Sequence, residues 1–79
     1  MPCDHAGPQD VIAMAEDELR ARGEAATSGT RFRFAENHDG YFASAITEVE
    51  RRGDGWVVTR LDRGKERLPD EELGLRQLA

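Results

Sequence analysis

The first apolar positions of the chain recur at the spacing of an amphipathic helix. They form one stripe on a helical surface: Val11, Ile12, Ala15 and Leu19, with Met14 at its edge. Pro8 suits the first helical position, and Gly23 supplies a C-terminal stop. The pattern predicts a helix over residues 8–22, and its narrow apolar stripe indicates that the helix lies on a surface.

Strict alternation begins after a connector of small residues. Phe32 and Phe34 point to one side of an extended chain, and Arg31 and Arg33 point to the other. This period of two predicts a half-buried strand over residues 30–36. The run 56–62 is rich in β-branched residues and begins with the tryptophan of the chain, so it predicts a further strand.

The segment 41–52 fits two patterns. Its apolar residues include a set at helical spacing and a set that alternates as in a strand: Phe42, Ala45, Ile46 and Val49 for the helix, and Tyr41, Ala43, Ala45, Thr47 and Val49 for the strand. A strand is favoured, because residues 53–55 (Gly-Asp-Gly) form a three-residue hairpin loop into the run 56–62. Ile46 then lies opposite Val49, so either a bulge intervenes or both faces are partly apolar.

The C-terminal tail predicts a short helix that starts near Pro69. The acidic residues 70–72 suit the first turn of a helix, although Gly74 weakens it by about 1 kcal/mol relative to alanine. The predicted fold class is therefore α+β, with an N-terminal helix packed on a three-stranded antiparallel meander and a short C-terminal helix (αβββα). Residues 1–79 form a single small domain, with residues 1–7 as a frayed tail.

Size and charge narrow the function classes. A chain of 79 residues supports one modest core, and domains of this size often gain stability by association. The net charge of −5 disfavours nucleic acid and anionic membranes as partners. No apolar run approaches the roughly 20 residues of a membrane span, and the N-terminus lacks the basic and apolar regions of a signal peptide. These features predict a cytoplasmic protein.

The residues that could carry chemistry do not form a catalytic or metal-binding motif. Cys3, His5, His38 and Asp39 are metal-ligand types, but they lack the paired spacing of a zinc site. No serine or cysteine has a patterned base beside it, as a nucleophile requires. We therefore expect no cofactor, no metal and no enzymatic activity. A small-ligand or metal-binding domain that uses His38 and Asp39 remains the alternative.

The tripeptide Arg52-Gly53-Asp54 also occurs in adhesion proteins. Adhesion would require a secreted, exposed loop, and no feature of the sequence directs secretion. Glycine and aspartate are also the residues that a hairpin turn favours, because they tolerate unusual backbone dihedrals. The tripeptide is therefore interpreted as a turn.

One segment resembles a known family. In residues 53–72 the Gly55-Trp56 start of a strand is followed by Arg67, Pro69 and Asp70, and this order is similar to the central part of gas vesicle protein O. The resemblance covers about a quarter of the chain. It implies an accessory component of gas vesicle assembly, in which Trp56, Arg67 and Pro69 would define the fold. The chain departs from the family after this segment, since the tail is leucine-rich.

The strongest functional prediction is contact with another protein. One helix covers one face of the predicted sheet. The apolar second face would be covered by the C-terminal leucines Leu73, Leu75 and Leu78 or, if they do not reach it, by a partner. The predicted interface comprises Tyr41, Val49, Trp56, Arg51 and Arg60, because aromatic and arginine side chains dominate binding hot spots. The chain is thus predicted to be a small non-enzymatic accessory or adaptor module whose partner is another protein or a second copy, with a gas-vesicle-type assembly protein as an alternative.

Overall fold

The chain folds into one helix and a four-stranded sheet in a computed structural model, which describes residues 6–79. The elements follow one another in the order α1 (Pro8–Ala21), β1 (Arg31–Asn37), β2 (Ser44–Arg52), β3 (Gly55–Gly64), a 3-10 turn (Asp70–Glu72) and β4 (Gly74–Leu78). The predicted α+β class is confirmed. No helix in this described range is long and apolar enough to cross a membrane.

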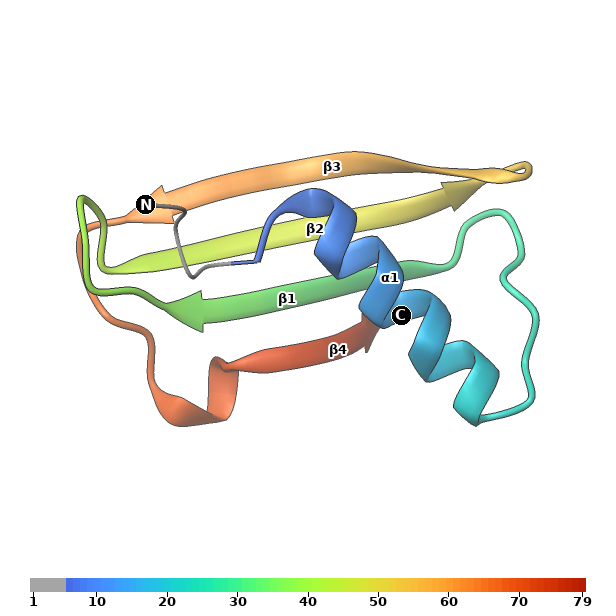
Figure 1. Cartoon of the computed structure of the whole chain (residues 1–79), viewed down its shortest axis with the longest axis horizontal. Coiled ribbons are helices and arrows are strands. Elements are labelled where there is room, and N and C mark those ends of the chain that lie inside the picture. The colour runs from blue at the N-terminus through green and yellow to red at the C-terminus, as the bar shows by residue number, and fades with distance from the viewer. Residues whose placement is uncertain (1–5) are drawn as a thin grey trace.

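All neighbouring strands of the sheet are antiparallel, in the order β3-β2-β1-β4. The first three strands form the predicted meander, and β4 returns to the other side of β1. Helix α1 crosses one face of the sheet and packs mainly on β2, with further contacts to β1 and β4 (Figure 1). The two layers therefore overlap only in part, and β3 lies at the margin of the helix.

Helix α1 begins and ends where the sequence signals predict. Pro8 is its first residue, and the Asp10 carboxylate accepts a hydrogen bond of 3.0 Å from the backbone N–H of Gly7. At the other end Gly23 has φ +72, and Glu24 N–H donates to the Leu19 carbonyl. This Schellman motif needs a residue that tolerates positive φ, so it explains the glycine stop.

The predicted frayed tail lies mostly outside the described residues. Its last two residues, Ala6 and Gly7, are described and are hydrogen-bonded. Ala6 N–H donates to the Glu36 carboxylate at 2.9 Å, and Gly7 N–H donates to Asp10. Ala6 therefore ties the start of α1 to the end of β1.

Residues 44–52 form a strand, so the prediction of a strand over a helix is confirmed, with a later start. The expected start at residue 41 was wrong, because residues 38–43 form the loop between β1 and β2, closed by a hydrogen bond from His38 N–H to the Ala43 carbonyl. The loop between β2 and β3 has two residues, Gly53 and Asp54, and not three, because Gly55 already pairs with Arg52. Gly53 has φ +63, which a two-residue turn of type II′ requires at this position.

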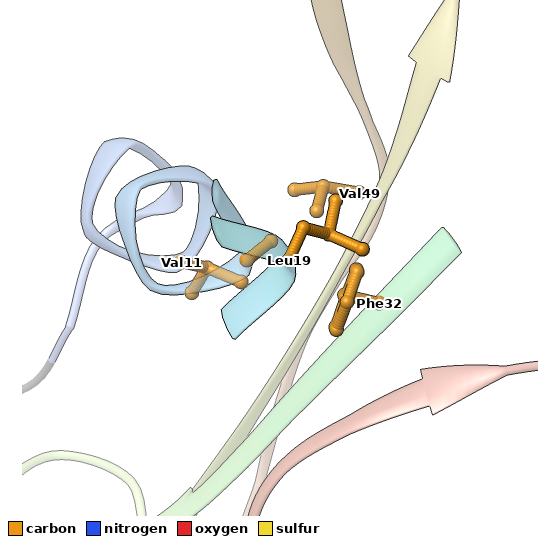
Figure 2. Close-up of a cluster of buried hydrophobic side chains, with 5 residues drawn as sticks. Val11, Leu19, Phe32 and Val49 are labelled. Carbon is orange, nitrogen blue, oxygen red and sulfur yellow. The ribbon is translucent and has the colours of Figure 1, made fainter. Parts of the chain in front are cut away.

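The core lies between α1 and the centre of the sheet. It contains Val11, Ala15, Leu19, Phe32 and Val49. Figure 2 shows Val11 and Leu19 on the helix facing Phe32 and Val49 on β1 and β2. The predicted helical stripe and the predicted inward side of the first strand therefore meet in one cluster. Fully burying side chains of this size contributes roughly 1.5–3 kcal/mol each.

The predicted C-terminal helix is wrong. Residues 70–72 form only a 3-10 turn, and residues 74–78 form β4. Leu73 is already extended (φ −80, ψ 152) and Gly74 has φ +99, so only a single helical turn fits after Pro69, which is too short for a stable helix. Pairing with β1 instead places Leu75 opposite Phe34 on the helix side, where Leu75 packs against the core.

Candidate functional site

Within residues 6–79, strand β3 combines an open sheet edge with exposed apolar side chains. It runs for 10 residues and has β2 as its neighbour on one side. Val58 is 44% exposed and Leu61 is 49% exposed, which makes them two of the three large apolar residues that are exposed in the described chain. This surface, the β3 flank, consists of Val58, Leu61 and the open edge of β3.

A bulge places both apolar side chains of the β3 flank on the same face. Val58 pairs with Val49 and Leu61 pairs with Thr47, and both partners face the helix. The register shifts between these pairs, so Thr59 is the extra residue on β3. Without it, residues three apart would point to opposite faces. The side chains point to the helix layer, yet α1 packs mainly on the other three strands and leaves them largely uncovered (Figure 1).

The opposite face of the sheet is mainly charged, in contrast to the apolar second face that was expected. Its charged members are Arg31, Arg33, Glu48, Glu50, Arg52, Arg60, Asp62 and Arg76. Its apolar members are buried or half-buried: Ala35, Ile46, Val57 and Leu78. The far face is therefore not the apolar surface that was expected, and the exposed side chains of Val58 and Leu61 lie on the helix side of β3 instead.

Arg60 stands on this charged face beside the β3 flank. Its guanidinium donates to Asp62 at 2.8 Å and to Glu48 at 3.1 Å. Hydrogen bonds to Asp62 and then to Glu48 raise the pKa of Arg60 above its ordinary value. An arginine side chain is charged at any physiological pH, and the two carboxylates hold the Arg60 guanidinium in place next to the open edge.

The other predicted interface residues do not share one surface. Val49 is fully buried beneath α1, so it is not available to a partner. Trp56 is half-buried: its Nε1–H donates to Glu16 of α1 at 3.1 Å, and its ring meets Phe32 edge-on at 6.5 Å. The Arg51 guanidinium lies 5.7 Å from the Trp56 ring. Trp56 and Arg51 thus fasten the helix to the sheet.

Tyr41 is fully exposed in the loop between β1 and β2. This loop and the segment after β3 line an open cleft of about 460 Å³, which includes Lys65 and Arg67. Beside the cleft, the His38 ring stacks on Phe42 with ring centroids 4.5 Å apart, and the Arg63 guanidinium lies 5.1 Å from the centroid of the Phe42 ring.

His38 and Asp39 both line the cleft, but their contacts are not those of metal ligands. The His38 ring packs on an aromatic ring, and the Asp39 carboxylate accepts a hydrogen bond from Arg67 at 3.2 Å. Within residues 6–79 no group of three metal-ligand side chains comes together. Cys3 and His5, the other predicted ligand types, lie outside the described residues. The chemistry that the cleft offers is cationic and aromatic.

Comparison of the chain with protein-family models, with curated protein sequences and with solved structures finds no significant match. The resemblance of residues 53–72 to gas vesicle protein O therefore stays a prediction. In the structure, Trp56 joins the core margin and Pro69 precedes the 3-10 turn.

Val58 and Leu61 were not among the predicted interface residues, although both lie in a predicted strand. A signal for them exists in the run 56–62. Val58 and Leu61 are three residues apart, so they cannot share a face of a regular strand. A bulge between them would bring both apolar side chains to one face, so this spacing favours a bulge. Which face they take depends on the helix, which lies more than thirty residues away in the chain.

Proposed function

We propose that this chain is a small non-enzymatic accessory module that binds another protein through the β3 flank. The observation that carries the proposal is the coincidence, on one strand, of a free sheet edge with Val58 and Leu61, both more than two-fifths exposed. An open edge offers backbone N–H and C=O groups to an extended strand of a partner, and the apolar side chains add contact area and selectivity.

The rest of the surface supports this location. The far face of the sheet carries paired charges, such as Arg60 with Glu48 and Arg33 with Glu72, which are satisfied within the chain. Trp56 and Arg51 are used to hold α1. The β3 flank is therefore the surface where a partner would remove the most apolar area from water.

The test is affinity capture from the native host with three tagged chains. Leu61→Asp places a charge in the β3 flank, and Ala13→Asp places the same charge on the exposed side of α1 as a matched control. We expect the wild-type chain and Ala13→Asp to capture the same protein and Leu61→Asp to lose it. Two-dimensional NMR spectra must show that each variant is folded. Equal capture by all three chains would overturn the proposal.

A second candidate function is binding of a small anionic ligand in the cleft beside the loop 38–43. The observation that favours it is the grouping of Lys65 and Arg67 with the exposed Tyr41 ring. Titration of the chain with inorganic phosphate and with an aromatic carboxylate, monitored by amide chemical shifts, tests this candidate. Saturable shifts confined to residues 38–43 and 64–67 would support it, and uniform or absent shifts would exclude these ligand classes.

A further inference from the structure

The partner of an edge strand can be a second copy of the same strand. Among residues 6–79, β3 has a neighbouring strand only on the β2 side, so its other edge is open over 10 residues. Two identical strands can pair antiparallel across a two-fold axis perpendicular to the sheet. Such an interface is closed, because each copy uses the same surface and no further edge of that kind remains.

Symmetry restricts the register of this pairing. In an antiparallel pair of identical strands around a two-fold axis, one residue must face its own copy, and its neighbours pair crosswise. A centre at Arg60, Asp62 or Arg63 would place two like charges in direct opposition, which destabilises a sheet. A centre at Val58 or Thr59 would place the bulge at the two-fold axis itself, whereas a centre at Leu61 moves it towards the ends of the paired segment.

A centre at Leu61 places opposite charges across from each other and gives the apolar side chain an apolar neighbour. Leu61 then faces its copy on the helix side, and its 49% exposed side chain gains an apolar neighbour. On the other side Arg60 faces Asp62 of the partner subunit, and the symmetric pair repeats this contact. Arg60 already donates to Asp62 and Glu48 of its own chain, but a guanidinium has five N–H donors. Arg60 is 43% and Asp62 is 60% exposed, so both side chains can add the contact across the pair. Opposite charges directly across two strands stabilise the pair.

We propose that two copies of the chain associate through antiparallel β3–β3 pairing centred on Leu61, with Arg60 and Asp62 as reciprocal charge pairs. This inference rests on the proposed contact function and names its partner. The two-fold axis keeps both helices on the same side of one continuous sheet, to which each copy contributes its four strands. The outer edges of that sheet are the two β4 strands, so the assembly ends at a dimer.

Reciprocal charge reversal tests the register. Arg60→Asp places a new carboxylate opposite Asp62 of the partner subunit, and Asp62→Arg places a new guanidinium opposite Arg60 of the partner subunit. Each variant alone therefore opposes like charges at both symmetric contacts. We expect each single variant to weaken self-association by at least about tenfold, because two opposite-charge pairs become two like-charge pairs. Sedimentation velocity over a wide concentration range measures the change, and two-dimensional NMR spectra confirm that each variant is folded.

Mixing the two variants gives the decisive measurement. In a mixed pair, the carboxylate introduced by Arg60→Asp meets the guanidinium introduced by Asp62→Arg. The second contact joins the Asp62 that the first variant retains to the Arg60 that the second variant retains, so both contacts become attractive. We expect an equimolar mixture to form a mixed dimer near wild-type strength, detected with a fluorescent dye on one variant. An effect of either variant on its own fold cannot produce this recovery.

The matched control is the pair of variants Arg20→Asp and Asp17→Arg. Arg20 and Asp17 form an exposed ion pair on α1, away from β3. Reversing either charge should leave self-association unchanged, because the charges of α1 do not take part in the β3–β3 contact.

The outcomes separate this inference from the proposed function. A wild-type monomer at all concentrations, single variants that dimerise like wild type, or a mixture that fails to recover would each overturn the β3–β3 pairing. If the pairing fails while Leu61→Asp still abolishes capture of a host protein, the contact function stands with a different partner. If Leu61→Asp changes neither capture nor self-association, both proposals fail.

Discussion

The two edge strands of this sheet are built differently, although both have one open side. Strand β4 has five residues, and its exposed side chains are the polar Arg76 and Gln77. Arg22, which directly follows α1, donates to Gln77, and Arg76 donates to the Glu71 carbonyl. Strand β3 has ten residues and exposes Val58 and Leu61. Short length, charged side chains and bulges are common protections of an edge. Strand β3 has exposed charges and a bulge, but it is twice as long as β4 and also exposes two large apolar side chains.

The position of the helix accounts for the difference. Leu75 on β4 and Leu61 on β3 both point to the helix layer, yet Leu75 packs against the core and Leu61 is half in solvent. The axis of α1 runs across β2 and β1 towards β4, and it diverges from β3 (Figure 1). An apolar residue on an edge strand is therefore core or binding surface according to what lies above it.

A substitution in the core that supports both edge strands should destabilise both and have the largest effect on the free energy of unfolding. Phe32 is fully buried on β1 between them, in the cluster under α1. Phe32→Ala should lower the free energy of unfolding by about 3–5 kcal/mol, which is most of the stability of a small domain. Urea denaturation followed by circular dichroism measures this loss. The control, Val58→Ala on the β3 flank, should change it by less than about 1 kcal/mol; similar losses in both variants would contradict the assigned core.

A substitution that strains the turn between β2 and β3 should destabilise β3 and leave β4 in place. Gly53 has φ +63 in the two-residue turn before β3, where a side chain costs about 1–2 kcal/mol. Gly53→Ala should therefore destabilise the chain by that amount and speed amide hydrogen exchange first in β2 and β3. Gly55→Ala is the matched control, because Gly55 has no positive φ and an added Cβ would meet no atom within 4 Å. Equal losses of stability in the two alanine variants would show that a side chain at Gly53 causes no strain in the turn.

The hydrogen bond between α1 and the start of β3 should contribute less to the free energy of unfolding. Trp56→Phe keeps an aromatic ring against Phe32 but removes the Nε1–H that donates to Glu16. We expect a loss of about 1 kcal/mol in the free energy of unfolding. A double-mutant cycle with Glu16→Ala checks the cause. If the hydrogen bond is responsible, Trp56→Phe should have almost no further effect in the Glu16→Ala background.

The smallest effect should come from the contact that protects β4. Arg22→Ala removes the side-chain hydrogen bond to Gln77 and the exposed ion pair with Glu18. Global stability should change by no more than about 1 kcal/mol, while amide exchange in β4 should become faster. Arg20→Ala, which removes only an exposed pair on the helix, should leave exchange in β4 unchanged. Unchanged exchange in both variants would show that Arg22 does not protect this edge.

The elements that the sequence predicted correctly depend on neighbours in the chain. The stripe of Val11 and Leu19, with Gly23 after it, specified α1, and the alternation around Phe32 specified β1. These signals are local because helical and extended geometry each impose a fixed spacing on the residues that share a face. The turn at Gly53 and Asp54 is local for the same reason, since only two residues must adopt it.

The candidate site was only partly predictable. Arg60, one of the predicted interface residues, does lie beside the β3 flank, and Tyr41 is exposed. Val49 was selected from the same strand pattern, but the helix buries it. Alternation separates the two faces of a strand without saying which face a distant helix will cover, so the pattern could not distinguish Val49 from Leu61.

The sequence by itself determined the helix and the order of the strands in the meander, because each is set by spacing and backbone preferences within a few residues. Only the tertiary structure decided that residues 74–78 form β4, since Leu75 becomes a core residue only when it pairs opposite Phe34, some forty positions earlier. Tertiary structure also decided that Leu61 is exposed. Burial depends on where α1 comes to rest on the completed sheet, and that position is set by all the side chains of the core together.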